Sequence, residues 1–271
     1  MSQIHRLFRE LRGLWPLLSW FDWALYLVNL VVALPACLRR RTLAPADSRM
    51  NRDIVCRVNG RDIVVPVGRI ATLIAPFDST PTFGGLREMY ASNVYLRAFR
   101  PGMAIDVALD LGANRGLFSL LAIKAHGARL AIGVEPLEGY DAVADLLRHV
   151  NGVAPAAMPR VVARAASSAG AGAVTVAELM ARWNLEWIDL LKCDIEGGEF
   201  DVLLVDSGFL AKVGNIAMEL HPEAGSCPDI VDALTRSGFT VLTTDQHGAP
   251  TGPRHPHYLY ASRTGDLVLG A

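Results

Sequence analysis

The sequence has little cysteine and almost no net charge. Four cysteines lie far apart without Cys-x-x-Cys spacing, so neither a disulfide framework nor a zinc knuckle is indicated. The 26 Lys and Arg residues balance 27 Asp and Glu residues to a net charge of −1. Nucleic acid is therefore not an expected partner, since binding it depends on positive charge. A reducing, cytoplasmic compartment suits the free thiols: Cys37, Cys56, Cys193 and Cys227.

Internal repeats and low-complexity tracts are also missing. With 271 residues, of which 51% are hydrophobic and 20% charged, the chain can bury a large core and is too apolar to be disordered. Its length suggests one large domain with an appendage. We predict three segments: an apolar helix and linker over residues 1–52, a β-hairpin and helix appendage over 53–99, and an α/β domain over 100–271.

Positive charge concentrates near the N-terminus. Residues 1–57 hold nine Arg against four acidic residues, net +5, which leaves the remainder at −6. This region surrounds an almost wholly apolar run over residues 14–34, which is long enough to span a membrane. Arginines flank the run on both sides: Arg6, Arg9 and Arg12 before it, and Arg39, Arg40 and Arg41 after it.

The apolar run carries one polar stripe, formed at steps of three and four by Ser19, Asp22, Tyr26 and Asn29. An Asp inside a span costs about 2.5 to 3.5 kcal/mol on insertion scales. A helix lying in the membrane interface avoids this cost, and a helix packed on protein or in a dimer is the alternative to both. A cleaved signal peptide is disfavoured because no small-residue cleavage site follows. We expect residues 14–34 to contact the inner face of the cell membrane peripherally, and oligomerisation stays open.

The middle of the chain predicts a small β unit. Residues 42–52 are polar and suggest a linker, whereas 53–58 and 61–67 alternate as strands around Asn59-Gly60, a strong hairpin signal. A loop over 76–85 and a helix over 86–99 follow.

From residue 104, short apolar runs alternate with amphipathic stretches. This pattern predicts an α/β fold with a largely parallel sheet and helices on both faces, binding its ligand outside the carboxyl ends of the strands. The predicted strands are 104–110, 129–134, 160–165, 188–194, 214–220, 239–244 and 257–262. The predicted helices are 116–126, 138–150, 175–183, 198–205 and 226–237.

A glycine-containing loop, DLGANRG over residues 110–116, joins the first of these strands to its helix. Glu135, followed by Pro136, ends the next strand, where an acid can accept hydrogen bonds from a ribose diol. A dinucleotide-binding loop needs Gly-x-Gly-x-x-Gly, but Asn114 replaces the second glycine and Asp110 supplies a carboxylate, which suits a cation. These features favour S-adenosylmethionine (SAM), with a nicotinamide or flavin dinucleotide and an empty structural relic as the alternatives.

A second charged block, IDLLKCDIEGGE over residues 188–199, ends another predicted strand. Lys192, Asp194 and Glu196 crowd this strand end, which indicates function, since buried parallel strands are otherwise apolar. Glu199 lies where a helix N-terminus favours an acid, and we interpret it as structural.

The blocks DLGANRGLFSL, GVEP, IDLLKCDIEGGEFDVL and MELH together resemble the FkbM-type SAM-dependent methyltransferase family, over about residues 99–221. The resemblance implies a Rossmann-like class I methyltransferase fold, SAM as cofactor, and methylation of a hydroxyl on a sugar, glycoconjugate, lipid-linked or polyketide-like acceptor. It implies that Glu135 lies at the ribose, Ala165 at the adenine, and Asp194 and Glu196 beside the transferred methyl, with Pro136 as a further cofactor-binding residue. The implied cofactor loop comprises Asp110, Gly112, Ala113, Asn114 and Gly116.

His221, at the end of the strand 214–220, could take the proton from an acceptor hydroxyl. We favour it as base over Asp194, with a loop-capping role as the alternative, and count Lys192 and Glu196 with them as catalytic candidates. His255 and His257 flank Pro256 without a nearby acid, so no metal ligand is predicted. A membrane-docked, SAM-binding assembly subunit without turnover is the alternative function.

Overall fold

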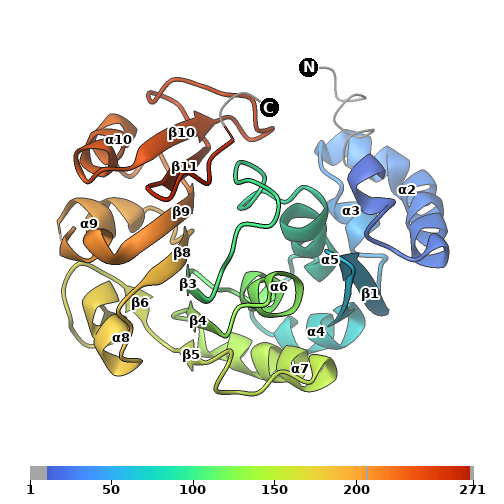
Figure 1. Cartoon of the computed structure of the whole chain (residues 1–271). Helices are drawn as coiled ribbons and strands as arrows, with labels where there is room; N and C mark the ends of the chain where they lie inside the picture. The colour runs from blue at the N-terminus through green and yellow to red at the C-terminus, as the bar shows by residue number, and fades with distance from the viewer. Residues whose placement is uncertain (1–10, 206, 269–271) are drawn as a thin grey trace.

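The computed structural model describes residues 11–205 and 207–268 (Figure 1). Arg6 and Arg9 of the basic flank lie outside these residues. Within them, the main sheet has seven strands. Their spatial order is β10 (Thr240–Thr244), β11 (Tyr258–Ser262), β9 (Val213–Glu219), β8 (Ile188–Cys193), β3 (Val107–Leu111), β4 (Leu130–Val134) and β5 (Arg160–Val161).

The strand order reverses between β3 and β8. From β3 the chain proceeds through β4 to the edge strand β5, then returns to β8 and continues to β9, all in parallel. Only β11 runs antiparallel to both of its neighbours, β9 and β10. Such a reversal opens a crevice at the carboxyl ends of the central strands. This sheet confirms the predicted Rossmann-like class I methyltransferase fold.

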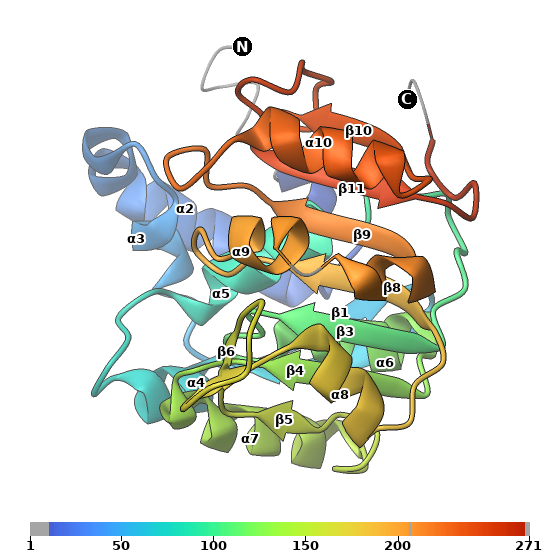
Figure 2. The ribbon, with the colours of Figure 1, turned by 90° about the vertical axis from the view of Figure 1, so that its left-hand side faces the viewer.

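Helices cover both faces of the sheet (Figure 2). One face carries α8 (Val176–Arg182), α9 (Glu199–Leu204) and α10 (Cys227–Arg236), and the other carries α6 (Leu117–His126) and α7 (Asp141–Asn151). Successive strand residues point to opposite faces, so Ala108 joins one core cluster while Leu109 joins the other. Two 3-10 turns complete the connections, η2 (Glu138–Tyr140) and η3 (Gly208–Lys212).

The predicted strand 160–165 is wrong as a single element. It divides into β5 in the main sheet and β6 (Arg164–Ala165), which pairs with β7 (Ala173–Val174) in a separate small sheet. The chain turns back through Gly172, whose φ is +70°, and Arg164 N–H donates to its carbonyl. This local pairing takes residues 164–165 out of the main sheet.

The predicted hairpin is confirmed as β1 (Asp53–Val58) and β2 (Arg61–Pro66), with positive φ at both Asn59 and Gly60. The segments around it differ from prediction. A helix α4 (Val67–Ile74) follows the hairpin directly, and α3 (Ala44–Asp47) lies within the expected linker 42–52.

The predicted helix 86–99 is also wrong. The chain forms α5 (Thr82–Leu86), partly inside the expected loop 76–85, then a π-helical turn η1 (Arg87–Ala91). Asn93 then adopts a left-handed conformation with φ +49°, which ends helical structure. Residues 94–98 continue as turns.

The apolar run forms α2 (Trp20–Arg40), and Ser19 caps its N-terminus by accepting from the Asp22 N–H. The polar stripe faces the protein: the Tyr26 hydroxyl donates to Asp47 at 2.9 Å, and Asn29 donates to the Arg49 carbonyl at 3.4 Å. Buried residues of α2, of the hairpin and of α6 and α7 belong to one core cluster. The three-segment division of the chain stays a prediction.

Candidate active site

The glycine loop after β3 approaches the end of β8 so closely that only glycine fits at position 112. Gly112 has φ +74°, and a Cβ there would lie 1.7 Å from the Asp194 carbonyl oxygen. Hydrogen bonds from Gly112 N–H and Ala113 N–H to the Val134 carbonyl fix the loop against β4, at 3.0 and 2.9 Å. Asn114 and Gly116 also have positive φ, and α6 begins at the next residue. The ends of β3, β4 and β8 thus meet at the loop.

Glu135 lies at the end of β4, directly against this loop. Its carboxylate is buried, at 7% exposure, and accepts from Asn114 N–H at 2.9 Å and Leu137 N–H at 3.0 Å. Each carboxylate oxygen keeps a further acceptor site, which a ligand hydroxyl could use. Pro136, next in the chain, is exposed, and Ala165 is buried in β6.

Lys192 is fully buried beneath the loop. Its ammonium donates to the Gly112 carbonyl at 2.6 Å and lies 3.2 Å from Asp110 and 3.7 Å from Asp194. Burial alone would lower the pKa of Lys192, but the charges of Asp110 and Asp194 outweigh it and raise the pKa. Lys192 therefore stays charged and holds two strand ends together, as a positioning residue.

Asp110 is also fully buried and supports the loop from below. Besides the ion pair with Lys192, it accepts from the Ser119 hydroxyl of α6 at 2.7 Å. Its carboxylate acts on the loop through these two partners.

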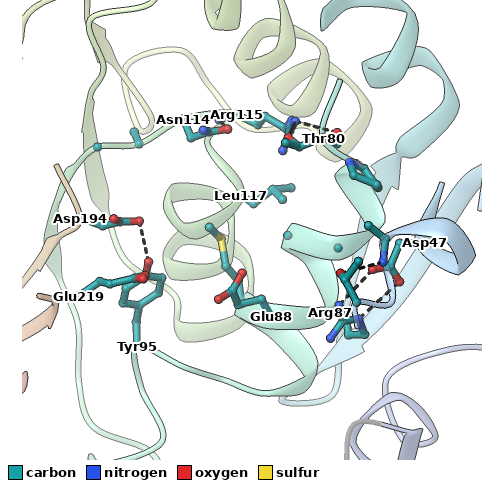
Figure 3. A pocket seen from close by; sticks show the side chains of 18 residues that line it. Asp47, Thr80, Arg87, Glu88, Tyr95, Asn114, Arg115, Leu117, Asp194 and Glu219 are labelled. Atoms are coloured by element: carbon teal, nitrogen blue, oxygen red, sulfur yellow. Dashed lines mark hydrogen bonds and ion pairs between the residues drawn. The ribbon is translucent and has the colours of Figure 1, made fainter. Parts of the chain in front are cut away.

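A pocket of about 330 Å³ opens at the loop and at the ends of β8 and β9 (Figure 3). Asp194, Glu219 and Tyr95 lie on one side of it, and Asp47 and Arg87 on the opposite side. The Tyr95 hydroxyl donates to Asp194 at 2.8 Å. The loop contributes Gly112, Ala113, Asn114 and Arg115.

Four carboxylates line this pocket: Asp47, Glu88, Asp194 and Glu219. Burial raises the pKa of Glu219 to about 8, and the charges of Asp194 and Glu88 contribute to the rise. Its carboxylate lies 3.3 Å from His257 Nε2. Sequence reasoning missed Glu219 as a site residue, although the two-residue strand period places positions 219 and 221 on one side.

His221 is held by Glu199, a fully buried acid at the start of α9. The ring Nδ1 lies 2.6 Å from Glu199 Oε1, and the backbone N–H of His221 donates to the same oxygen at 3.0 Å. Burial alone would lower the pKa of His221, but the hydrogen bond with Glu199 and the charges of Glu199, Glu196 and Asp194 raise it. Glu199, interpreted from the sequence as a helix N-terminal acid, thus orients His221.

Glu196 lies at the outer rim. Its side chain is 89% exposed, its φ is +53°, and its carboxylate lies 3.4 Å from His221 Nε2. Donor atoms of Asp194, Glu196 and His221 lie within 4.8 Å of one another, close enough for a cation to bind all three. The sequence had given no indication of a metal ligand here.

Comparison with known proteins bears mainly on the fold. No family model matches the chain. A 70-residue stretch is 41% identical to part of the AMB antimetabolite synthetase AmbE of Pseudomonas aeruginosa; the match covers 24% of this chain and 3% of that protein. The chain thus spans a small fraction of the curated relative it matches.

Solved structures with low sequence identity to this chain are also similar to it in fold. Methyltransferase FkbM from Methylobacillus flagellatus is 15% identical, with a TM-score of 0.42 over 70% of this chain and 57% of that one. The N-terminal domain of human METTL16 in complex with SAH is 13% identical, with a TM-score of 0.45 over 69% and 72%. The chain has a class I methyltransferase fold.

Proposed function

We propose that this protein is a SAM-dependent O-methyltransferase of FkbM type. The observation that carries the proposal is the junction of the Gly112 loop with Glu135 and Asp194 at the strand-order reversal. The structure gives two members of the charged block 192–199 a role. Lys192 holds the glycine loop, and Glu199 holds the ring of His221.

The residues present fit SAM. Glu135 would hold the ribose with its remaining acceptor sites, and the segment around Ala165 would flank the adenine. The carboxylate of Asp194, which lines the pocket, suits a cationic cofactor better than a pyrophosphate. When bound, SAM supplies a methyl group on a sulfonium, whose neutral thioether is a good leaving group.

The chain itself must align the acceptor hydroxyl and take its proton. His221 Nε2 is suited to this, because Glu199 holds the opposite ring nitrogen and fixes the tautomer. Glu219 is the second candidate base, since it lines the pocket and its raised pKa of about 8 suits proton transfer near neutral pH.

The acceptor is a hydroxyl of a sugar, glycoconjugate, lipid-linked or polyketide-like molecule. Labelled SAM incubated with the protein and extracts of the source cell, separated into lipid, glycan and small-molecule fractions, would show which class is methylated. Calorimetry with SAM, SAH and NADPH is the prior test. Binding of NADPH in place of SAM would overturn the methyltransferase assignment, and SAM binding without transfer to any fraction would favour the assembly-subunit alternative.

A further inference from the structure

Helix α2 buries its polar side and exposes its apolar side. Asp22, Tyr26 and Asn29 face the protein and are buried. The opposite side carries large apolar residues, with Val31 71% exposed. A surface helix in water normally has the reverse arrangement. The exposed apolar face of α2 comprises Trp20, Phe21, Val28, Val31, Val32, Leu34 and Leu38.

Within residues 11–52 the exposed charged side chains are all positive. Residues 11–52 contain two acidic residues, Asp22 and Asp47, and both are buried. The arginines of the same segment are exposed: Arg12, Arg39, Arg40, Arg41, Arg49 and Arg52. An apolar helix face edged by arginines matches an anionic lipid surface, which accepts both the side chains and the charge.

The polar contacts of α2 decide how it would meet a bilayer. The helix is long and apolar enough to cross a membrane, but a third of its most apolar window is buried in the protein. To cross, it would have to break the Tyr26–Asp47 and Asn29–Arg49 hydrogen bonds. A helix lying flat keeps these bonds. Pairing with a second copy would bring the two sets of arginines together, which charge repulsion opposes.

The segment after α2 forms part of the pocket wall. Thr42, Ala44 and Asp47 line the same pocket as Gly112 and Asp194. The chain therefore enters the pocket wall two residues after α2 ends at Arg40, and Figure 3 shows Asp47 on that wall.

We infer that the exposed apolar face of α2 docks on an anionic bilayer and places the pocket beside it, so that the acceptor is a membrane-borne amphiphile. The second half of this inference rests on the proposed function; the first half does not.

Vesicle flotation tests the docking. We expect the full chain to float with vesicles of phosphatidylcholine and phosphatidylglycerol more than with phosphatidylcholine alone. Val31→Asp should weaken this binding by about tenfold or more. Val205→Asp is the matched control, because Val205 is also 71% exposed but lies beside α9, and it should bind as wild type. SAM affinity should be equal in all three proteins.

Equal flotation of the Val31→Asp variant and wild type would overturn the docking. So would a wild-type dimer in solution that Val31→Asp converts to monomer, since a second copy would then cover the face. Retained vesicle binding after replacing Arg39, Arg40 and Arg41 by Gln would overturn the role of charge.

Labelled methyl transfer to a lipid extract, reconstituted into the same anionic vesicles, tests the acceptor. We expect a labelled lipid-phase product with wild type and Val205→Asp, and about a tenfold loss with Val31→Asp. A water-soluble product, or equal transfer by Val31→Asp, would overturn the membrane-borne acceptor. Failure of all three proteins to bind SAM would instead overturn the proposed function.

Discussion

At the scale of single residues, Gly112 sets how closely the ends of β3 and β8 approach. We expect Gly112→Ala to abolish SAM binding, because its Cβ would collide with the Asp194 carbonyl. Gly102→Ala is the control: Gly102 has a similar φ of +78° but no atom within 4 Å of its Cβ position. Left-handed strain alone costs about 1 to 2 kcal/mol, so urea unfolding should show that loss at Gly102 and a larger one at Gly112. Equal losses would mean that the loop relaxes away from Asp194.

Glu135 is the residue placed to read a ribose. We expect Glu135→Ala to weaken SAM and SAH binding by about 1.5 to 3 kcal/mol, through loss of charge-assisted hydrogen bonds. Calorimetry measures this, with Glu138→Ala as the control, since Glu138 is an exposed acid nearby. A folded Glu135→Ala variant with unchanged affinity would remove Glu135 from the site.

The base must be deprotonated to accept a proton, so methyl transfer should fall as the pH drops through its pKa. If His221 is the base, the midpoint of the acidic limb of the pH–rate profile lies above about 6.5, the ordinary pKa of histidine, because Glu199 and its acidic neighbours raise the pKa of His221. Glu199→Gln removes the largest of these charges, so the limb should move to lower pH with SAM affinity unchanged. His221→Asn should cost about 10² to 10⁴ in single-turnover rate.

The competing outcome concerns Glu219. If the limb lies near the pKa of about 8 and disappears in Glu219→Gln, while His221→Asn retains turnover, then Glu219 is the base and His221 caps a loop.

Several site residues could be predicted from the sequence because they follow apolar strands directly. Gly112, Glu135 and Asp194 each lie at a strand end, and parallel strands end at one edge of the sheet. Tyr95 and Glu88 could not be predicted as site residues, since the segment predicted as one helix over 86–99 instead forms η1, which contains Glu88, and turns, which contain Tyr95. The contact between Glu199 and His221 could not be predicted either, because the position of Glu199 is explained equally well by its place at a helix N-terminus.

At the scale of elements, the sequence predicts best where a segment has one dominant environment. Strands β3 and β4 are buried at every residue, and they appear as apolar runs that only Asp110 of β3 interrupts. The prediction of a helix over 86–99 is wrong because Asn93 adopts a left-handed conformation, which composition does not indicate. The orientation of α2 could not be decided either, since its polar stripe fits an interface and a protein contact equally well until its partner Asp47 is placed.

Asp47 fastens α2 to the rest of the chain. It is 2% exposed and accepts from Tyr26 at 2.9 Å and from Arg87 at 3.0 Å. We expect Asp47→Ala to lower the free energy of unfolding by about 3 to 5 kcal/mol, because it removes the carboxylate that neutralises a largely buried guanidinium. Asp62→Ala, which breaks the exposed pair with Arg57, should change stability little. Urea denaturation compares the two, and similar small losses would show that α2 is held by apolar packing alone.

At the scale of the whole molecule, the core cluster on the α6 and α7 side joins residues far apart in sequence, from Leu14 to Tyr260. The pocket is likewise shared, with Thr42 and Asp47 from the N-terminal segment and Gly112 and Asp194 from the α/β domain. Composition divides the chain into three segments, but shared burial predicts that these segments unfold together.

The five tryptophans can test this cooperativity, because three lie near the N-terminus and two near α8. A variant with Trp183→Phe and Trp187→Phe keeps the three N-terminal tryptophans and reports on that region. A variant with Trp15→Phe, Trp20→Phe and Trp23→Phe keeps the two tryptophans near α8 and reports on the sheet. We expect fluorescence in urea to fall in one transition, with each variant's midpoint equal to its own midpoint by circular dichroism. SAH at about 100 times its dissociation constant should stabilise both variants by about 2.7 kcal/mol. An earlier transition at the N-terminal tryptophans, unaffected by SAH, would make residues 1–52 an independent unit and restore the division that composition suggests.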